Sequence, residues 1–492
     1  MTGPPAGSVR DWLDRRAAET PDRISHVFAD EGGAVLTWGE LRRSAQAIAR
    51  RLSGLGTGKG ESVAICQTNG GGAVLALFGV LYGGFRATPL NLAAGPAAMG
   101  YALAHSGARH AFVGSDQMEM FREASASGGS DAVAIPYGSL IDWPRGREGD
   151  LVSVDPGDDA LLMYTSGTTG RPKGVVHSQS SLLAGGWTTA LAHELSPEDR
   201  ALCILPVFHI NGLCVTLMGP LVSGGIAIVA ERFSLSRFWD HCGRYEATWF
   251  SAVPTVLSHL LHGDETPTLE VVGRLRFARS ASAPLPVEVH AAFEKRFGIP
   301  IVETMGLTET AAQILSNPLP PGERRIGSPG RAVGNEARII DGEIAVRGPN
   351  VMRGYLRDPE ETAAAFTADG WLLTGDLGRM DADGYVFVTG RRKELIIKGG
   401  ENIAPREVDE ALHACEHVVE AAAFARPSDV YGQTVEAAVT LADGAPVSEA
   451  DLIALCQARL GPFKTPDRIH VLDELPKGPS GKIQRLKLAE LL

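Results

Sequence analysis

Apolar segments of strand length alternate with segments of helix length along the first half of the chain. Residues 62–66 form a short, mostly apolar run, and a longer apolar run follows at 72–82. Residues 41–52 carry Leu, Ala and Ile at helical spacing behind a strand-like stretch at 34–36. Apolar strands separated by helices are typical of largely parallel sheets that helices cover. The alternation therefore predicts an α/β fold.

The same alternation recurs after residue 199 and gives way to a different pattern at residue 326. Strand-like runs lie at 202–205, 226–229 and 249–251. From 326 to 388, short β segments are separated by Gly- and Asp-rich turns. These segments predict a small β-barrel or sheet that closes the large domain.

A basic cluster at 390–393 marks a second change of pattern in a chain of 492 residues, which is too long for one compact core. Beyond it, helix-like and strand-like segments alternate over about 100 residues, the size of a small α+β domain. We therefore predict a large domain at 1–389, a hinge at 390–393 and a small domain at 394–492.

Charge and cysteine usage limit the classes of function. A formal net charge of −12 argues against nucleic-acid binding, which relies on Lys and Arg to neutralise phosphates. Residues 201–230 lack Asp, Glu, Lys and Arg, but Pro206, Asn211 and Gly224-Gly225 interrupt them, so we expect core structure rather than a membrane span. The six cysteines form no Cys-x-x-Cys pair, and the N-terminus lacks the apolar core of a signal peptide. We expect a cytoplasmic monomer or homodimer.

Residues 164–174, Tyr-Thr-Ser-Gly-Thr-Thr-Gly-Arg-Pro-Lys-Gly, form a loop rich in hydroxyl groups and glycine between two strand-like segments. Its N–H groups and hydroxyls can cradle phosphate oxygens, with Lys173 as a point charge. The loop is not a Walker A motif, because Arg171 and Pro172 follow Gly170 where that motif has Lys and then Ser or Thr. Taken alone, it is as well interpreted as a flexible surface hairpin.

The loop resembles the signature loop of the adenylate-forming (ANL) superfamily, which contains acyl- and aryl-CoA synthetases, peptide-synthetase adenylation domains and beetle luciferases. Segments at 304–310, 371–376, 390–394 and 479–483 resemble further motifs of that superfamily in the same order. The resemblance covers essentially the whole chain and identifies it as an AMP-dependent acyl-CoA synthetase. It implies a large N-terminal domain of two βαβ-type sheets plus a small β-barrel, with a mobile α+β C-terminal domain.

The resemblance also implies a site for ATP and Mg²⁺. Thr308 would contact the AMP phosphate, and Glu309 would hold Mg²⁺ with Thr168, since a hard cation prefers oxygen ligands. Asp376 would accept hydrogen bonds from both ribose hydroxyls, because a carboxylate has two acceptor oxygens. Lys482 would stabilise charge that develops during adenylation. Without the resemblance, Glu309 would be interpreted as a helix-start residue, Asp376 as part of a turn and Lys482 as a solvated surface charge. The residues assigned to ATP and AMP are Thr165, Ser166, Gly167, Thr168, Thr169, Lys173, Ser282, Ala283, Pro284, Glu303, Thr304, Met305, Thr308, Asp376, Arg391 and Lys482.

The segment 206–212 resembles the superfamily's acyl-pocket segment, in which His209 would stand between the substrate carboxylate and the pocket wall. The segment lacks the Asp that binds an amino-acid ammonium group, which argues against an amino-acid substrate. The resemblance further implies a hinge at Lys393 and a tunnel for coenzyme A beside Lys398, Gly399 and Gly400. The residues assigned to the acyl pocket are His209, Ile210, Gly212, Ser251, Val253, Ser282, Gly306 and Leu307.

These assignments predict that the chain joins a small carboxylic acid to CoA in two steps. The acid and ATP would give acyl-AMP and pyrophosphate, and the CoA thiol would then take the acyl group. The alternative is a stand-alone enzyme that loads the pantetheine thiol of an acyl carrier protein, which the sequence separates poorly from a CoA ligase. A non-catalytic nucleotide-binding protein is disfavoured because the motif residues are all present, and no motif excludes a luciferase-like oxygenase.

Overall fold

The computed structural model describes residues 3–136, 148–165, 172–442, 444–478 and 482–492. One sheet of the large domain runs in the order β15-β14-β13-β12-β11-β9-β10-β1-β2. Its strands from β13 to β1 are parallel, whereas β2, β14 and β15 pair in the antiparallel direction. The strands are β1 (Ile24–Phe28), β2 (Ala34–Thr37), β9 (Arg200–Cys203), β10 (Ile226–Val229), β11 (Trp249–Ala252), β12 (Phe277–Ser280), β13 (Ile301–Leu307), β14 (Ala312–Ser316) and β15 (Arg331–Ala332).

A second sheet runs in the order β18-β8-β7-β4-β3-β5-β6 and is parallel from β7 to β6. Strands β7 and β8 are antiparallel, so the Gly- and Thr-rich loop connects the strands of a hairpin, as its flanks predicted. The strands are β3 (Ser62–Cys66), β4 (Arg86–Pro89), β5 (His110–Val113), β6 (Val133–Pro136), β7 (Asp159–Thr165), β8 (Lys173–Ser178) and β18 (Gly354–Tyr355). The α/β fold with βαβ-type sheets is confirmed.

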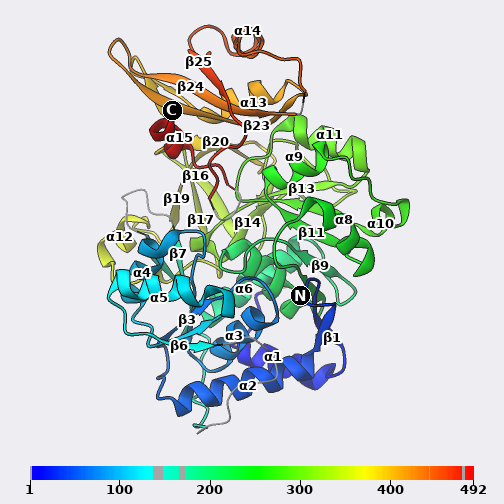
Figure 1. Ribbon diagram of the computed structural model, residues 1–492, viewed down its shortest axis with the longest axis vertical. Helices are drawn as coiled ribbons and strands as arrows, with labels where there is room; N and C mark the ends of the chain where they lie inside the picture. Colours follow the sequence, from blue (N-terminus) through cyan, green and yellow to red (C-terminus); the bar gives the residue numbers. More distant parts are fainter. Residues whose placement is uncertain (1–2, 137–147, 166–171, 443, 479–481) are drawn as a thin grey trace.

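Helices connect the strands and cover the faces of both sheets (Figure 1). One hydrophobic cluster takes Phe78 from α3, Trp187 from α6 and Trp249 from β11, so both sheets share a core. The helices of the large domain are α1 (Val9–Glu19), α2 (Trp38–Gly54), α3 (Gly71–Tyr82), α4 (Gly95–Ser106), α5 (Met118–Gly128), α6 (Gln179–Ala192), π-helix η2 (Asn211–Met218), α7 (Gly219–Ser223), α8 (Leu235–Arg244), α9 (Pro254–His262), α10 (Leu269–Arg274), α11 (Val287–Phe297) and α12 (Pro359–Ala364).

The region of short β segments forms an antiparallel sheet in the order β16-β17-β19-β20. Its strands are β16 (Glu336–Ile340), β17 (Glu343–Arg347), β19 (Leu372–Met380) and β20 (Val386–Arg391). Its inner face packs Val346, Leu372 and Val386 against Met305 and Val175 of the larger sheets, which attaches it to the large domain.

The C-terminal part of the chain forms an α+β unit that sits above α9 and α11 (Figure 1). Ile396, Val408, Val435 and Leu452 belong to a hydrophobic cluster whose members all follow residue 395. Its elements are β21 (Ile396–Lys398), β22 (Glu401–Ile403), α13 (Pro405–His413), β23 (Val418–Ser428), β24 (Gly432–Leu441), α14 (Glu449–Leu460), β25 (Arg468–Val471) and α15 (Arg485–Leu491).

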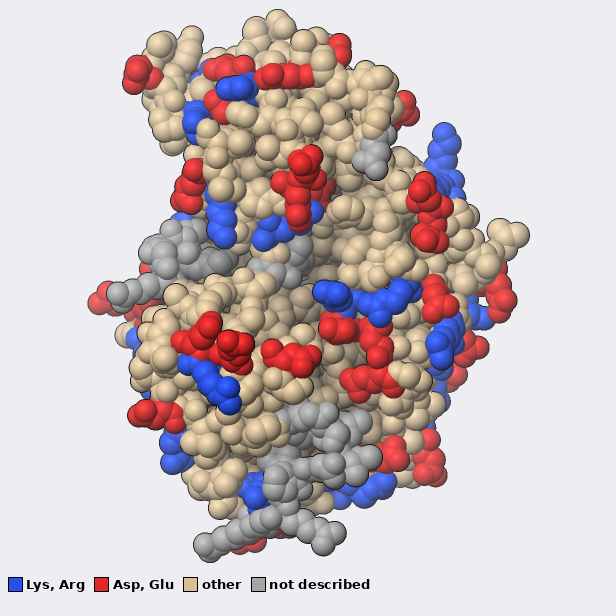
Figure 2. All heavy atoms as spheres, viewed as in Figure 1, with Lys and Arg blue, Asp and Glu red and all other residues tan. Residues whose placement is uncertain are grey.

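The surface and the helices also bear on the expected partners. In the described ranges, none of the helices is long and apolar enough to cross a bilayer. Acidic and basic side chains are interspersed over the face that Figure 2 shows.

Candidate active site

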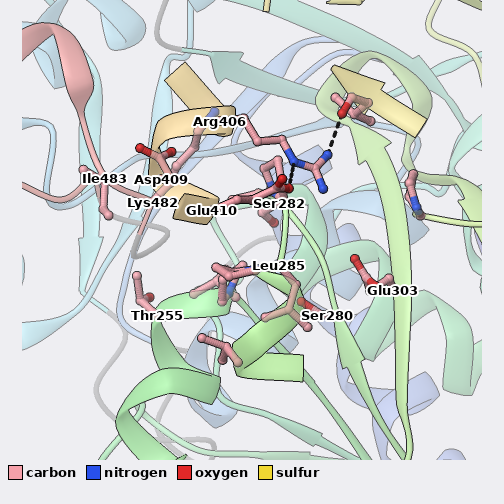
Figure 3. A pocket seen from close by; sticks show the side chains of 18 of the residues that line it. Thr255, Ser280, Ser282, Leu285, Glu303, Arg406, Asp409, Glu410, Lys482 and Ile483 are labelled. Atoms are coloured by element: carbon pink, nitrogen blue, oxygen red, sulfur yellow. Dashed lines mark hydrogen bonds and ion pairs between the residues drawn. The ribbon is translucent and has the colours of Figure 1, made fainter. Parts of the chain in front are cut away.

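A cavity lies between the large domain and the C-terminal unit, and Figure 3 shows many of the side chains that line it. Its walls come from the segment after β12, the end of β13, α9 and α11 on one side, and from α13 and β23 on the other. Lys482 and Ile483 enter it from the C-terminal segment (Figure 3). The sequence-predicted residues that line it are Val253, Ser282, Ala283, Pro284, Glu303, Thr304, Met305, Gly306, Leu307, Asp376, Arg391 and Lys482.

Asp376 and Arg391 form an ion pair at the edge of this cavity. They are partners in the register of β19 and β20, and Arg391 Nε donates to Asp376 Oδ1 over 2.8 Å. Burial raises the pKa of Asp376, while the positive charge of Arg391 opposes that rise. The pair offers acceptor oxygens beside a cation, which suits a ribose diol next to a phosphate.

Lys482 adds a second cation to the same cavity. Burial lowers the pKa of the Lys482 ammonium, and the nearby Arg391 lowers it further. An anion bound between two such cations relieves their repulsion and favours the charged lysine. The cavity therefore brings a lysine from the end of the chain to the place where the Asp376–Arg391 pair can hold a nucleotide.

Tyr355 organises a second polar cluster near this cavity. Its hydroxyl donates to Glu309 Oε1 over 3.0 Å, and the Lys173 ammonium, which pairs with Glu361, lies 5.0 Å from its ring centroid. Burial and then the Glu309 carboxylate raise the pKa of Tyr355. The Asp376 carboxylate does most to raise the pKa of Arg391, and Glu309 adds a smaller contribution, so the cluster acts electrostatically on the cavity wall.

Glu309, the predicted magnesium ligand, keeps one carboxylate oxygen available while Tyr355 holds the other. Within the part of the chain that the structure describes, no hydrogen bond or ion pair engages the second oxygen of Glu309, which suits it to a hard cation. The neighbouring Thr308 accepts at its backbone oxygen from His177 Nε2 over 2.6 Å, and this bond anchors the 3₁₀ turn η3 (Thr308–Thr310). Ser166, Gly167, Thr168 and Thr169 lie outside the described residues.

The predicted acyl-pocket residues divide into two groups. Val253, Ser282, Gly306 and Leu307 line the cavity, whereas His209, Ile210, Gly212 and Ser251 do not. The buried Nε2 of His209 has no hydrogen-bond partner in the described ranges, and burial lowers the pKa of this histidine to about 4. His209 is therefore neutral at neutral pH.

The predicted CoA-tunnel residues lie at the turn between β21 and β22 and do not line the cavity. Lys398 is buried against Asp467, with its Nζ 3.6 Å from the carboxylate, and its ammonium lies 5.6 Å from the ring centroids of Tyr431 and Phe463. Gly399 and Gly400 are exposed and adopt φ angles of 59° and 89°. A rotation of the C-terminal unit would be needed to bring this turn to the cavity.

Several residues of the site were not predicted from the sequence. Tyr355 and Glu361 stand outside the motifs, and nothing in their sequence surroundings marks them. The same is true of a group on the C-terminal unit that lines the cavity: Arg406, Asp409, Glu410, Glu420 and Arg485. Their roles arise from contacts between parts of the chain that are far apart in sequence.

Comparison with known proteins agrees with this site. The AMP-binding enzyme family matches residues 13–356, and the AMP-binding enzyme C-terminal domain matches residues 407–482. The chain is 46% identical over 490 residues to a sulfoacetate–CoA ligase of Cupriavidus necator, covering 96% of each protein. It is 34% identical over 507 residues to an oxalate–CoA ligase of Arabidopsis thaliana, covering 97% of each.

A solved structure shares the fold over nearly the whole chain. The O-succinylbenzoate coenzyme A synthetase MenE from Bacillus subtilis, in complex with ATP and magnesium ion, has a TM-score of 0.83 and 31% sequence identity. The match covers 97% of this chain and 98% of that one. The chain therefore belongs to the AMP-binding enzyme family, among its AMP-forming carboxylic acid–CoA ligases.

Proposed function

We propose that this ligase activates a short carboxylic acid that carries a second anionic group. Three relatives support this substrate class through the acids in their names: sulfoacetate, oxalate and 2-succinylbenzoate. Each of these acids has a sulfonate or a second carboxylate besides the carboxylate that is activated. The shared feature is a second negative charge, whereas the carbon skeletons differ.

The convergence of Lys482 and the Asp376–Arg391 pair in one cavity carries the proposal of acid adenylation. Asp376 would bind the ribose hydroxyls, and Lys482 would lie between the substrate carboxylate and the α-phosphate. A carboxylate oxygen attacks the α-phosphorus, the bond to the bridging oxygen breaks, and pyrophosphate leaves. Positioning and charge neutralisation supply most of such a rate enhancement. Mg²⁺, held by Glu309 and Thr168, would screen the phosphate charge when bound.

The second step needs a different arrangement of the two domains. The CoA thiolate attacks the acyl carbon of acyl-AMP, a C–S bond forms, and AMP leaves with the electrons of the C–O bond. We propose that the domains at 1–389 and 394–492 rotate about Lys393, so that Lys398, Gly399 and Gly400 come to the cavity. The separate hydrophobic cluster of the C-terminal unit supports its movement as one body.

We further propose CoA rather than a carrier protein as the acceptor, and a monomer or homodimer in the cytoplasm. The CoA ligases among the relatives support the acceptor. All six cysteines are free, which fits a reducing compartment.

A panel of acids tests the proposed substrate class. We expect hydroxylamine to trap acyl-AMP from sulfoacetate, oxalate or another short dianionic acid, and not from decanoate or benzoate at equal concentration. Adding CoA to the active acids should release a thioester, whereas a pantetheinylated carrier protein should not accept the acyl group. Efficient activation of decanoate alone would contradict the proposal.

A further inference from the structure

Arg279 is a buried cation without an acidic partner. Its side chain is 1% exposed, in the middle of the sheet on β12. Nε donates to Gln313 Oε1 over 3.0 Å, and Nη1 donates to Asn211 Oδ1 over 3.0 Å and to Ser251 Oγ over 2.9 Å. All three acceptors are neutral. Throughout the described ranges, no carboxylate forms an ion pair with Arg279.

A buried guanidinium with neutral partners is costly, because ionised groups lose several kcal/mol of hydration on burial. Burial lowers the pKa of Arg279 to about 9, which still leaves it charged at neutral pH. A purely structural link between these strands could use a neutral amide without that cost. The neutral partners of Arg279 therefore do not by themselves account for a charged side chain at this position.

The guanidinium is linked through Asn211 to Ser282, a cavity residue that the sequence assigned to the acyl pocket. Asn211 Nδ2 donates to Ser282 Oγ over 3.2 Å. One hydrogen-bonded side chain thus separates the cation from the cavity wall.

Arg279 also orients the donors between it and the cavity. Asn211 Oδ1 accepts from both Arg279 and Ser251, so the amide must turn its N–H₂ group toward Ser282. His209, two residues before Asn211, is neutral and adds no competing charge. The part of the cavity at Ser282 is therefore backed by one positive charge and a donor group aligned by it.

We propose that Arg279 is a specificity-determining residue that favours acids with a second anionic group, by its charge and by holding Asn211 with its donor toward the cavity. The inference rests on the proposed function and identifies a residue of this chain whose charge favours the second anionic group of the acid. It assigns Arg279 a positioning and electrostatic role, with no part in the bond-making steps. An acid with a neutral group of the same size would lose this interaction.

Matched acids separate the charge from size. Sulfoacetate and methylsulfonylacetate differ in one negative charge at similar volume, and so do malonate and malonamate. We expect the wild-type enzyme to favour the dianionic acid of at least one pair over its monoanionic partner by more than about tenfold in kcat/KM. Arg279→Gln should lower that ratio by about tenfold or more, mainly through KM for the charged acid, and Arg279→Lys should restore part of it.

The control is Arg86→Gln. Arg86 is another buried arginine of the large domain, but it donates to Ser62 Oγ and pairs with Asp159 over 3.2 Å. Its loss should leave the ratio unchanged. If Arg279→Gln does not fold, Asn211→Asp places a negative charge against Arg279 and should reduce the ratio likewise. Thermal unfolding of each variant identifies those that fold.

Equal losses for both members of a pair in Arg279→Gln would assign Arg279 a structural role and overturn the inference while leaving the proposed function intact. A wild-type enzyme that activates methylsulfonylacetate and malonamate but rejects sulfoacetate and malonate would overturn the proposed function, and the inference with it. If the wild-type enzyme prefers the dianionic acids and the ratio of kcat/KM within a pair is unchanged in both Arg279→Gln and Asn211→Asp, the inference alone would be overturned.

Discussion

At the scale of single residues, the site depends on cations that have different partners. Arg391 is held by Asp376, and Lys173 by Glu361, whereas Lys482 faces the cavity with its pKa lowered by burial. Among the described residues, no carboxylate forms an ion pair with Lys482, and a bound anion stabilises such a cation most. Lys482 is therefore the residue whose loss should affect the charged transition state most directly.

We predict that Lys482→Ala lowers the rate of acyl-AMP formation by at least about 100-fold, in the range found when one electrostatic donor is removed from an active site. Thioester formation from supplied acyl-AMP should stay within about threefold of wild type, because that step does not need the lysine at the α-phosphate. ATP–pyrophosphate exchange and thioester release measure the two steps. Lys487→Ala, at an exposed position of α15, is the control. Adenylation at the full rate in Lys482→Ala would contradict the role of this lysine.

At the scale of elements, the end of β13 forms one wall of the cavity. Gly306 lines the cavity, and the strand pairing is irregular between Met305 and Gly306. A Cβ atom at Gly306 would lie 1.6 Å from the backbone oxygen of Ala312. Because the neighbour is backbone, it cannot move aside as a flexible side chain could. The close approach therefore fixes the shape of this wall.

We predict that Gly306→Ala lowers the free energy of unfolding by about 2 kcal/mol, as overpacking of a core does. Acid activation should fall by at least about tenfold, because a displacement of the wall misplaces the acid. Thermal unfolding and hydroxamate formation measure the two effects. Gly273→Ala is the matched control, since a Cβ there meets no atom within 4 Å. Equal behaviour of the two variants would show that the wall tolerates the methyl group.

The turn between β21 and β22 should matter for the second step alone. A Cβ at Gly400 meets no atom within 4 Å in this arrangement of the domains, although its φ of 89° disfavours larger residues. We predict that Gly400→Leu slows thioester formation by at least about tenfold more than acyl-AMP formation, since a side chain would fill the path of the thiol arm.

The control for the Gly400 variant is Gly461→Leu, which has a φ of 75° and also meets no atom within 4 Å. It likewise places leucine at a positive φ in the same unit, after α14. Rates of both half-reactions are compared for the two variants. Equal slowing of both half-reactions in Gly400→Leu would argue against a tunnel at this turn.

At the scale of the whole molecule, the buried histidines of the large domain make stability depend on pH. Burial lowers the pKa of His26 to about 3, of His177 to about 4 and of His193 to about 3, from an ordinary value of 6.5. Below that ordinary value the unfolded chain takes up protons that the folded chain does not. The stability that these groups contribute is thus complete above about pH 6.5 and falls with pH toward their folded values.

We predict that a fall in pH from 7 to about 5 lowers the free energy of unfolding by about 2 kcal/mol for each of these histidines. The midpoint of thermal unfolding should therefore drop steeply over this interval, and unfolding at about pH 5 should be accompanied by proton uptake. Calorimetry in buffers of different ionisation enthalpy measures that uptake. A midpoint that stays constant between these pH values would contradict the prediction.

Local patterns in the chain were sufficient for most of the architecture and the nucleotide motifs. The strand at 226–229 matches β10, and the apolar run at 72–82 falls in α3. The strand expected at 202–205 is β9 at Arg200–Cys203, because the last apolar residues of that run continue into the loop. Periodicity is a property of neighbouring residues, so these elements could be predicted without knowing their partners.

The surroundings of the acid depended on the folded contacts. The contacts of the buried Arg279 involve residues 211, 251 and 313, which only the fold brings together. Tyr355 becomes a partner of Glu309 because β18 pairs with β8. Burial and charge pairing are set by residues distant in sequence, and no local pattern encodes them. The chemistry of the enzyme could thus be predicted from its motifs, whereas the proposed preference for a second anionic group rests on three-dimensional contacts of a buried arginine.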